Sequence, residues 1–247
     1  MRAIVTGGAK GIGREMVIYL KELGFDILVI DKDQGALKLL KDKYKIKTKR
    51  FNLANENDVF AFVELLEKDN FSVFINNAAF GWFGIFSETS LTEELEMIDL
   101  NIKSYHILMK KVIQKYEKEN GGYLLNVSSS AGFLCAPRMA TYYATKNYVT
   151  KLTIAVQEEL RRNHSNVNLS LLCPGKVGTD FYKRAKGNIR MDEYSARYVA
   201  RYGIDQLFKQ KRIIVPGKKM KLSLFLQRFI SWKLLAKIMY SIHVTKN

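Results

Sequence analysis

A glycine-rich turn stands between the first apolar run of the chain and its first helical stretch. Residues 6–13 read Thr-Gly-Gly-Ala-Lys-Gly-Ile-Gly, directly after the apolar run at 3–5. Glycines in this placement let the backbone turn sharply and approach a pyrophosphate at the amino terminus of a helix. The order of strand, turn and helix therefore favours a β-α-β unit with a nucleotide at the edge of the sheet.

Short apolar runs alternate with longer stretches of helical period along the whole chain. Strands are predicted at 3–5, 26–30, 73–75, 123–127, 167–172 and 213–215. Helices are predicted at 13–23, 34–41, 56–68, 92–117, 141–161 and 192–209. The connections are too long for hairpins, so we expect right-handed crossovers and a parallel sheet covered on both faces. The predicted fold class is α/β, with one doubly wound domain over 1–247 and a last strand and helical lid or tail at about 211–247.

Composition and cysteine content set the broad class of protein. With 47% hydrophobic residues and 3 prolines, the chain is expected to be globular and not disordered. Cys135 and Cys173 are too few for a disulfide framework. Met1 runs almost directly into an apolar stretch without the features of a secretory leader, and no run of about 18 apolar residues predicts a membrane span. We therefore expect a cytoplasmic protein.

Positive charge is in excess and is unevenly distributed. The formal net charge is +16, and no acidic residue follows Asp205. Such a field attracts anionic partners, but no RNA-binding or helix-turn-helix signature is present, so specific nucleic-acid binding is not expected. Residues 221–240 mix apolar side chains with cationic ones. We interpret this segment as a helical substrate lid or an oligomer contact, with a weak membrane-surface contact as the alternative.

Asp31 ends the second predicted strand, where a carboxylate can accept hydrogen bonds from an adenosine ribose. The same charge repels a 2′-phosphate, which favours NAD over NADP. Lys10, Arg14 and Lys32 lie close enough in sequence to neutralise Asp31 or to bind that phosphate. NAD is therefore the preferred cofactor, and NADP is the alternative.

A Tyr-x-x-x-Lys pair falls on a predicted helix, so Tyr142 and Lys146 emerge one turn apart on the same face. Ser129 lies 13 positions upstream of the tyrosine, just past a predicted buried strand. The end of a central strand and a neighbouring helix can place these groups around one crevice. Strand alternation sends Ser128 and Ser130 to the opposite face, which favours Ser129.

At this point the sequence resembles the short-chain dehydrogenase/reductase family over nearly its first 190 residues. The resemblance is specific because the family's motifs occur in order with suitable spacing. They are Thr6 to Gly13, Asn76-Asn77-Ala78-Ala79, Asn101, Ser129, Tyr142 with Lys146, and the segment that begins at Pro174-Gly175. Two departures are visible: Ala79 replaces the last glycine of the strand-end motif, and Asn52 stands where many members carry Asp near the adenine.

The resemblance implies an NAD(P)-binding Rossmann fold and a set of catalytic roles. Tyr142 would donate a proton in carbonyl reduction and accept one in alcohol oxidation. Lys146, with the nicotinamide charge, would lower the pKa of that phenol and hold the nicotinamide ribose. Ser129 would hydrogen-bond the substrate oxygen. Asn101 would hold a water in the proton relay to Lys146, although an amide in a helix can also simply bond a neighbouring carbonyl.

The resemblance also implies a set of cofactor contacts and an oligomer. The long helices at 92–117 and 141–161 match the pair through which family members form dimers or tetramers. The implied cofactor-binding residues are Thr6, Gly7, Lys10, Gly11, Ile12, Gly13, Asp31, Asn52, Leu53, Asn77, Ala78, Tyr142, Lys146, Pro174, Gly175, Val177 and Thr179.

Aromatic and apolar residues follow the predicted strand ends, where a substrate crevice is expected. They are Phe80, Trp82, Phe83, Phe86, Phe133, Leu134, Pro137, Phe181 and Tyr182. They predict a hydrophobic ketone or secondary alcohol as substrate, although several of them could pack a core or a dimer interface instead. The three histidines are scattered singly, so no metal site is expected, and Cys135 is interpreted as a packing residue.

Two other classes of function remain open from the sequence. One is a noncatalytic, nucleotide-sensing or surface-binding basic protein, supported only by the positive charge. The other is an epimerase or dehydratase on the same fold that recycles its nicotinamide. Such relatives tend to be longer and to have a different glycine spacing.

Overall fold

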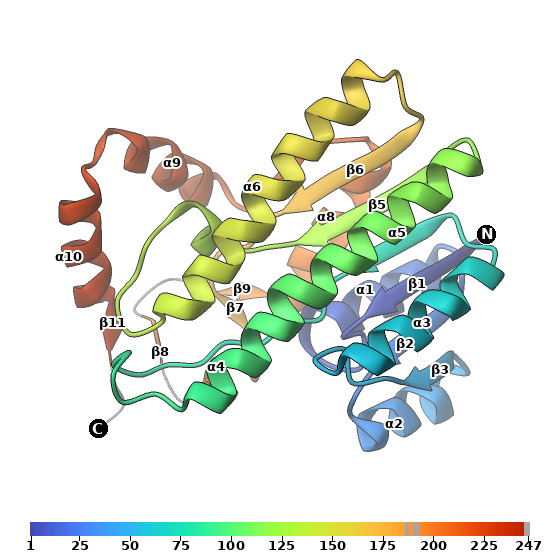
Figure 1. Cartoon of the computed structure of the whole chain (residues 1–247), viewed down its shortest axis with the longest axis horizontal. Coiled ribbons are helices and arrows are strands. Elements are labelled where there is room, and N and C mark those ends of the chain that lie inside the picture. The colour runs from blue at the N-terminus through green and yellow to red at the C-terminus, as the bar shows by residue number, and fades with distance from the viewer. Residues whose placement is uncertain (186–187, 190–192, 245–247) are drawn as a thin grey trace.

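The centre of the protein is a sheet whose strands all run in one direction. In this computed structural model, residues 1–185, 188–189 and 193–244 are described, and within them seven strands pair in the order β10-β6-β5-β4-β1-β2-β3, each neighbouring pair parallel. The strands are β1 (Arg2–Thr6), β2 (Asp26–Asp31), β3 (Lys47–Arg50), β4 (Val73–Asn76), β5 (Gly122–Val127), β6 (Val167–Leu172) and β10 (Ile213–Ile214). The order reverses between β1 and β4, which is where doubly wound sheets bind ligands (Figure 1).

Successive side chains of the central strands point to opposite faces of the sheet. In β1, Ala3 and Val5 belong to one apolar core, and Ile4 between them belongs to another. The first core packs against α1 (Gly11–Glu22), α2 (Gln34–Tyr44) and α8 (Ala196–Phe208). The second packs against α3 (Glu56–Lys68), α5 (Tyr105–Lys118) and α6 (Ala140–Arg162), and Figure 1 shows α5 and α6 in front of the sheet. The predicted doubly wound α/β fold is confirmed.

One strand of the sheet was not predicted. β3 reads Lys-Thr-Lys-Arg, and its side chains are mostly exposed. It lies at the edge of the sheet and pairs only with β2 among the described strands, with Arg50 opposite Asp31. Charged side chains protect such an edge from pairing with other chains, but they remove the apolar signal that identifies buried strands.

The predicted helix at 92–117 is interrupted in the structure. It forms as α4 (Leu91–Ile98), a π-helical turn (Asp99–Ser104) and α5. The helix predicted at 192–209 begins instead at Ala196, where the hydroxyl of Ser195 accepts a hydrogen bond from the N–H of Tyr198 at 3.1 Å. Asp192, the expected start, lies outside the described residues.

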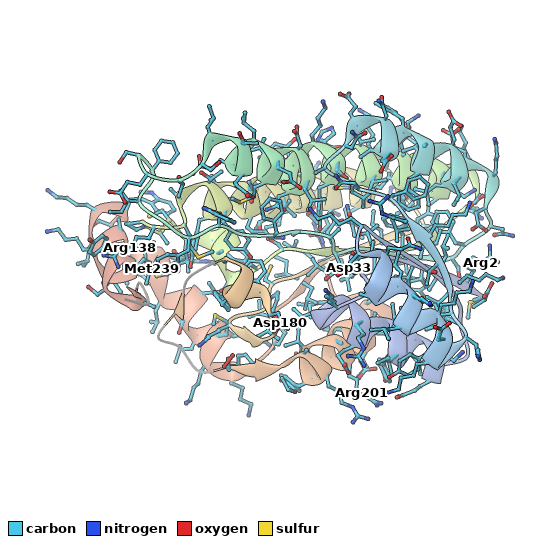
Figure 2. All side chains as sticks on the ribbon, turned by 90° about the horizontal axis from the view of Figure 1, so that it is seen from below. Arg2, Asp33, Arg138, Asp180, Arg201 and Met239 are labelled. Carbon is cyan, nitrogen blue, oxygen red and sulfur yellow. The ribbon has the colours of Figure 1, made fainter. Side chains whose placement is uncertain are left out.

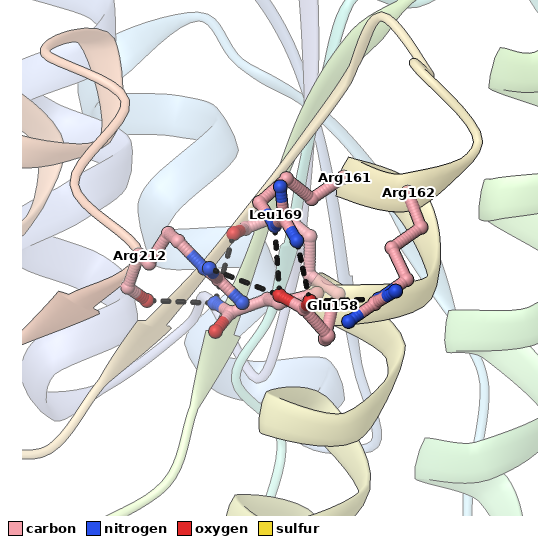
Figure 3. A network of polar contacts seen from close by, with 6 residues as sticks. Glu158, Arg161, Arg162, Leu169 and Arg212 are labelled. Atoms are coloured by element: carbon pink, nitrogen blue, oxygen red, sulfur yellow. Dashed lines mark hydrogen bonds and ion pairs between the residues drawn. The ribbon is translucent and has the colours of Figure 1, made fainter.

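A polar network fixes the β6–β10 edge of the sheet to α6 (Figure 3). The side-chain nitrogen of Gln157 donates to the carbonyl oxygens of Leu169 at 2.9 Å and Arg212 at 2.7 Å. Glu158 beside it forms ion pairs with Arg161, Arg162 and Arg212, and its hydrogen bonds to Arg161 and Arg162 lower its pKa to about 2. The short strand β10 is thereby held by side chains as well as by its ladder.

The C-terminal segment forms a helical extension beyond the sheet. It consists of α9 (Lys218–Leu226), a short 3₁₀ turn (Gln227–Phe229), α10 (Trp232–Ile242) and β11 (His243–Val244), which pairs antiparallel with β8 (Asn188–Ile189). α10 buries Leu235 and Met239 in an apolar cluster that also contains Tyr142. Figure 2 shows Met239 beside Arg138 at the end of the molecule opposite Arg2. The predicted helical extension is therefore present, and its inner side packs next to the tyrosine.

Candidate active site

The glycine turn between β1 and α1 forms a close-packed cradle. Gly7 and Gly11 have φ angles of +62° and +57°, a region that side chains disfavour. A Cβ atom on Gly13 would lie 2.3 Å from the carbonyl oxygen of Gly7. Lys10, at the helix N-cap, supplies no side-chain hydrogen bond to α1, so the first N–H groups of the helix can serve an anionic ligand.

Thr6 and Asn77 connect this cradle to the end of β4. The Thr6 hydroxyl accepts hydrogen bonds from the N–H groups of Asn77 at 2.9 Å and Ala78 at 3.1 Å. The Asn77 side chain donates to the carbonyl oxygens of Thr6 at 2.9 Å and Gly7 at 3.1 Å. Thr6 is fully buried and does not line the cavity, so its observed contacts position the turn.

The Asp31 carboxylate also contacts the glycine turn. It accepts hydrogen bonds from the N–H of Ala9 and the N–H of Asp33, both at 3.1 Å. The nearby cations have partners elsewhere, since Lys10 forms an ion pair with Asp33, Lys32 pairs with Glu96 at 2.9 Å, and Arg14 bonds Tyr44. Asp31 is therefore held in place by backbone groups.

A cavity of about 390 Å³ runs along the carboxyl ends of the central strands. It brings the glycine turn, Asp31, the strand ends and the Tyr-Lys pair to one space, which are the groups that would hold a dinucleotide in a doubly wound fold. Asp33, Gly81 and Asp180 line it without having been predicted. The predicted catalytic and cofactor-binding residues that line it are Gly7, Lys10, Gly11, Ile12, Gly13, Asp31, Asn52, Leu53, Asn77, Ala78, Ser129, Tyr142, Lys146, Pro174, Gly175, Val177 and Thr179.

Tyr142 and Lys146 are both buried and both line this cavity. The Lys146 Nζ atom lies 5.9 Å from the centre of the Tyr142 ring and donates to the carbonyl oxygen of Val127 at 3.1 Å. Burial raises the pKa of Tyr142 to about 12, opposed by a hydrogen bond with Ser129. Burial likewise lowers the pKa of Lys146 to about 8. In the protein alone, burial is the dominant influence on the pKa of Tyr142, and the lowering that was expected from Lys146 together with the nicotinamide charge is not seen.

The three neighbouring serines have different surroundings. The Ser129 hydroxyl reaches Tyr142 and also accepts from the N–H of Ala131 at 3.2 Å. The Ser128 hydroxyl is buried and bonds the carbonyl oxygen of Lys146 at 3.1 Å and the hydroxyl of Thr150 at 2.7 Å. Ser130 begins the 3₁₀ turn Ser130–Phe133. Of these hydroxyls, the one on Ser129 interacts with the tyrosine and acts to lower its pKa.

Asn101 lies in the π-helical turn and is fully buried outside the cavity lining. Its side-chain oxygen accepts from the N–H of Phe80 at 3.2 Å, and its nitrogen donates to the carbonyl oxygen of Phe80 at 2.9 Å. The same nitrogen donates to the hydroxyl of Thr145 at 3.1 Å, one residue before Lys146. Asn101 therefore fixes the backbone at the cavity wall to the helix that carries the Tyr-Lys pair.

The expected aromatic wall divides into three groups. Phe80, Phe181 and Tyr182 line the cavity, and the Phe181 and Tyr142 ring centres are 5.2 Å apart. Trp82, Phe83 and Leu134 pack in the cluster next to Tyr142, and Phe133 packs in another cluster. Phe86 is 69% exposed. Like Phe86, Pro137 does not line the cavity, so the wall is narrower than predicted.

The described residues, 1–185, 188–189 and 193–244, include neither a metal-binding cluster nor a membrane-spanning helix. Across that part of the chain, no three His, Cys, Asp or Glu side chains are grouped so that they could share a metal ion. In the same ranges no helix combines the length and apolar character needed to cross a bilayer.

Comparison with known proteins agrees with the order of the motifs. The family model described as short chain dehydrogenase matches residues 1–189. An uncharacterized oxidoreductase of Staphylococcus saprophyticus is 28% identical over 182 residues, or 72% of this chain and 74% of that protein. A very-long-chain 3-oxoacyl-CoA reductase of Mycosarcoma maydis is 30% identical over 181 residues, which cover 69% of this chain and 51% of the longer relative.

Solved structures show the same fold. A short-chain dehydrogenase/reductase from Burkholderia phymatum, in complex with NAD, has a TM-score of 0.83 at 22% identity, with 92% of each chain covered. A short-chain dehydrogenase from Sphingobium yanoikuyae, in complex with NADPH, has a TM-score of 0.82 at 20% identity, with 94% of each chain covered. The family model matches residues 1–189, which is well over half of this chain. The chain therefore belongs to the short-chain dehydrogenase family.

Proposed function

We propose that the protein is an NAD(P)-dependent oxidoreductase that moves a hydride between nicotinamide and a carbonyl or alcohol carbon, with Tyr142 as the general acid and base. The observation that carries this proposal is the meeting of Ser129, Tyr142 and Lys146 in the cavity that also contains the glycine cradle. A nucleotide sensor has no need of a buried proton donor at that position. The family membership supports the same class of chemistry.

In the direction of reduction, a nicotinamide cofactor held by the glycine turn and the strand ends would supply the hydride to the carbonyl carbon. Tyr142, with its pKa raised to about 12, holds its proton at neutral pH and can give it to the carbonyl oxygen. Ser129 donates a hydrogen bond to that oxygen as negative charge develops. Lys146, whose ammonium lies near the ring, favours the phenolate that remains. Asn101 acts as a positioning residue, since its side chain bonds Phe80 and Thr145 and so holds the helix that carries the Tyr-Lys pair.

NAD is the cofactor that we propose, with NADP as the alternative. Asp31 lines the cavity and brings negative charge that would repel a 2′-phosphate, whereas the charge of Asp33 is offset by its ion pair with Lys10. Lys10, Arg14 and Lys32, which could offset that charge, have partners of their own. The solved structures with this fold include complexes with NAD and with NADPH, so the fold itself does not select the cofactor. We propose that these charged side chains determine the preference for NAD.

A hydrophobic ketone or secondary alcohol is the substrate that we propose. Phe80, Phe181 and Tyr182 give the cavity an aromatic wall beside Tyr142. The 3-oxoacyl-CoA reductase among the relatives is named for a ketone on a long acyl chain, which agrees with this class.

We also propose that residues 1–247 form one cofactor-binding domain and that the protein is a homodimer or homotetramer through α5 and α6. We propose a cytoplasmic location, which is supported by the free thiols of Cys135 and Cys173.

A panel of apolar ketones and secondary alcohols, assayed with NAD(H) and NADP(H) by nicotinamide absorbance, tests the proposal. We expect net absorbance change with at least one apolar pair. An epimerase or dehydratase that recycles its nicotinamide would convert substrate with no net change. A sensor would bind nucleotide, seen as thermal stabilisation, and turn over no compound in the panel.

A further inference from the structure

The outer side of α9 carries large apolar side chains that face solvent. Leu222, Phe225 and Leu226 are each at least half exposed, and Phe229 in the following turn is 76% exposed. Their spacing of three and four residues places them on one side of the helix. Leu224, on the opposite side, is buried against the protein. α9 is therefore apolar on both sides, whereas a helix on an ordinary protein surface is apolar only on its inner side.

Cations border this apolar stripe. Lys218 and Arg228 flank it in sequence and are exposed, and α10 adds exposed Lys233 and Lys237. No acidic residue occurs after Asp205 in the sequence, so nothing carried by this segment offsets their charge. We call the stripe and these four cations the tail surface. Trp232, the first residue of α10, is 66% exposed.

The tail surface lies at one end of the molecule. Figure 1 shows α9 and α10 at the end opposite α2 and β3, well away from the front face where α5 crosses the sheet. The inner side of α10 is already occupied, since Leu235 and Met239 pack in the cluster that contains Tyr142. The segment thus covers the interior on one side and offers a cationic apolar surface on the other.

We propose that the tail surface docks on an anionic lipid bilayer, with the α9 stripe entering the interface and the bordering cations meeting lipid headgroups. Exposed leucine and phenylalanine edged by lysine and arginine are the features of an interfacial helix. The charge argues against a second copy as the partner, because a symmetric contact would bring two uncompensated cationic borders together. The phosphates of a nucleic acid would pair with the cations but would offer no apolar contact to the leucines and phenylalanines.

This docking does not depend on the proposed chemistry, so it can be tested without a substrate. The full-length protein is mixed with vesicles of phosphatidylcholine alone or with about a third phosphatidylserine, and the bound fraction is measured by co-sedimentation. Phe225→Ser/Phe229→Ser removes the apolar contact, and Lys233→Glu/Lys237→Glu reverses two charges. The controls are Leu39→Ser/Phe60→Ser and Lys38→Glu/Lys41→Glu, which make the same kinds of change at exposed positions of α2 and α3.

We expect the wild type and both controls to bind the anionic vesicles and to bind neutral vesicles weakly. Both tail variants should lose roughly tenfold or more in affinity, because each lysine near an anionic membrane contributes a severalfold gain. Thermal unfolding of all four variants shows whether each is folded.

Three results would overturn the proposal. One is vesicle binding that the tail variants do not reduce. Another is a dimer, measured by light scattering, that Phe225→Ser/Phe229→Ser dissociates while vesicles bind neither form. The third is binding to an unrelated duplex DNA that depends on Lys233 and Lys237 without any vesicle binding.

Discussion

The hydroxyl of Tyr143 and the Nε2 atom of His243 lie 3.1 Å apart in the protein interior. The Nδ1 atom of His243 lies 2.7 Å from the carbonyl oxygen of Met239, which can only accept, so Nδ1 carries the proton. Nε2 of the neutral ring is then the acceptor for the Tyr143 hydroxyl. One hydrogen bond therefore joins the residue after Tyr142 to the end of the C-terminal helix.

We expect Tyr143→Phe and His243→Leu each to destabilise the fold by about 1–3 kcal/mol, because each leaves a buried polar partner unpaired. In a double-mutant cycle measured by urea unfolding, the pair should show a coupling of at least about 0.5 kcal/mol. Tyr148 and His106 are the matched control, since they form a 2.8 Å hydrogen bond of the same kind at the surface. Equal coupling in the two pairs would contradict a special role for the buried one.

Stability should fall on mild acidification through His243. Burial lowers the pKa of His243 below its usual 6.5, so the unfolded chain takes up a proton at a higher pH than the folded protein does. The stabilisation is complete above about 6.5 and is lost as pH falls from there to the lowered pKa. Urea unfolding between pH 7.5 and 5 (roughly the range of histidine titration) should show this loss in the wild type and a shallower slope in His243→Leu. Parallel slopes would refute the assignment.

Gly13→Ala should abolish nucleotide binding, because the new Cβ atom would lie 2.3 Å from the carbonyl oxygen of Gly7 and distort the cradle. Gly35→Ala is the matched control, since the nearest atom to its Cβ would be 3.6 Å away, on Asp33. We expect saturating NAD to raise the Tm of the wild type and Gly35→Ala by several degrees, and that of Gly13→Ala hardly at all. A normal shift in folded Gly13→Ala would mean that nucleotide binds elsewhere.

Asp31→Asn should reduce the preference for NAD over NADP by roughly tenfold or more, because it removes the charge that repels a 2′-phosphate. The two dissociation constants can be compared by titration calorimetry. Asp42→Asn, at an exposed position of α2, makes the same change away from the cavity and should leave the ratio unchanged. Wild-type protein that binds NADP as tightly as NAD would show that Lys10, Lys32 or another cation dominates.

The strands that could be predicted from the sequence are those that are buried in the sheet. β1, β4 and β5 are largely buried on both faces and have nearly continuous apolar sequences, so the short apolar runs located them. β3 is exposed, and it is held by pairing with β2. Its own sequence has no apolar pattern from which that pairing could be predicted. The π-helical turn at Asp99–Ser104 was also missed, because a one-residue widening of a helix leaves its apolar period nearly intact.

The candidate site was predictable where a motif fixes the backbone. The glycine turn and the Tyr-Lys pair lie on one continuous segment each, and the parallel sheet brings their segments to the same edge. The contacts that fix the site from a distance were not predictable. Asn101 bonds Phe80 across 21 residues, and Tyr143 bonds His243 across 100, so only the folded chain relates them.

The central claim is that the Tyr142 hydroxyl transfers the proton that accompanies hydride transfer, and it is tested most directly by Tyr142→Phe. We expect turnover of an active ketone to fall by about 10²–10⁴-fold, because general acid catalysis is lost, while the dissociation constant for NADH stays within about threefold. Tyr148→Phe, farther along α6, should keep its turnover. If Tyr142→Phe binds NADH normally and turns over at a rate close to that of the wild type, another group supplies the proton and the account is wrong.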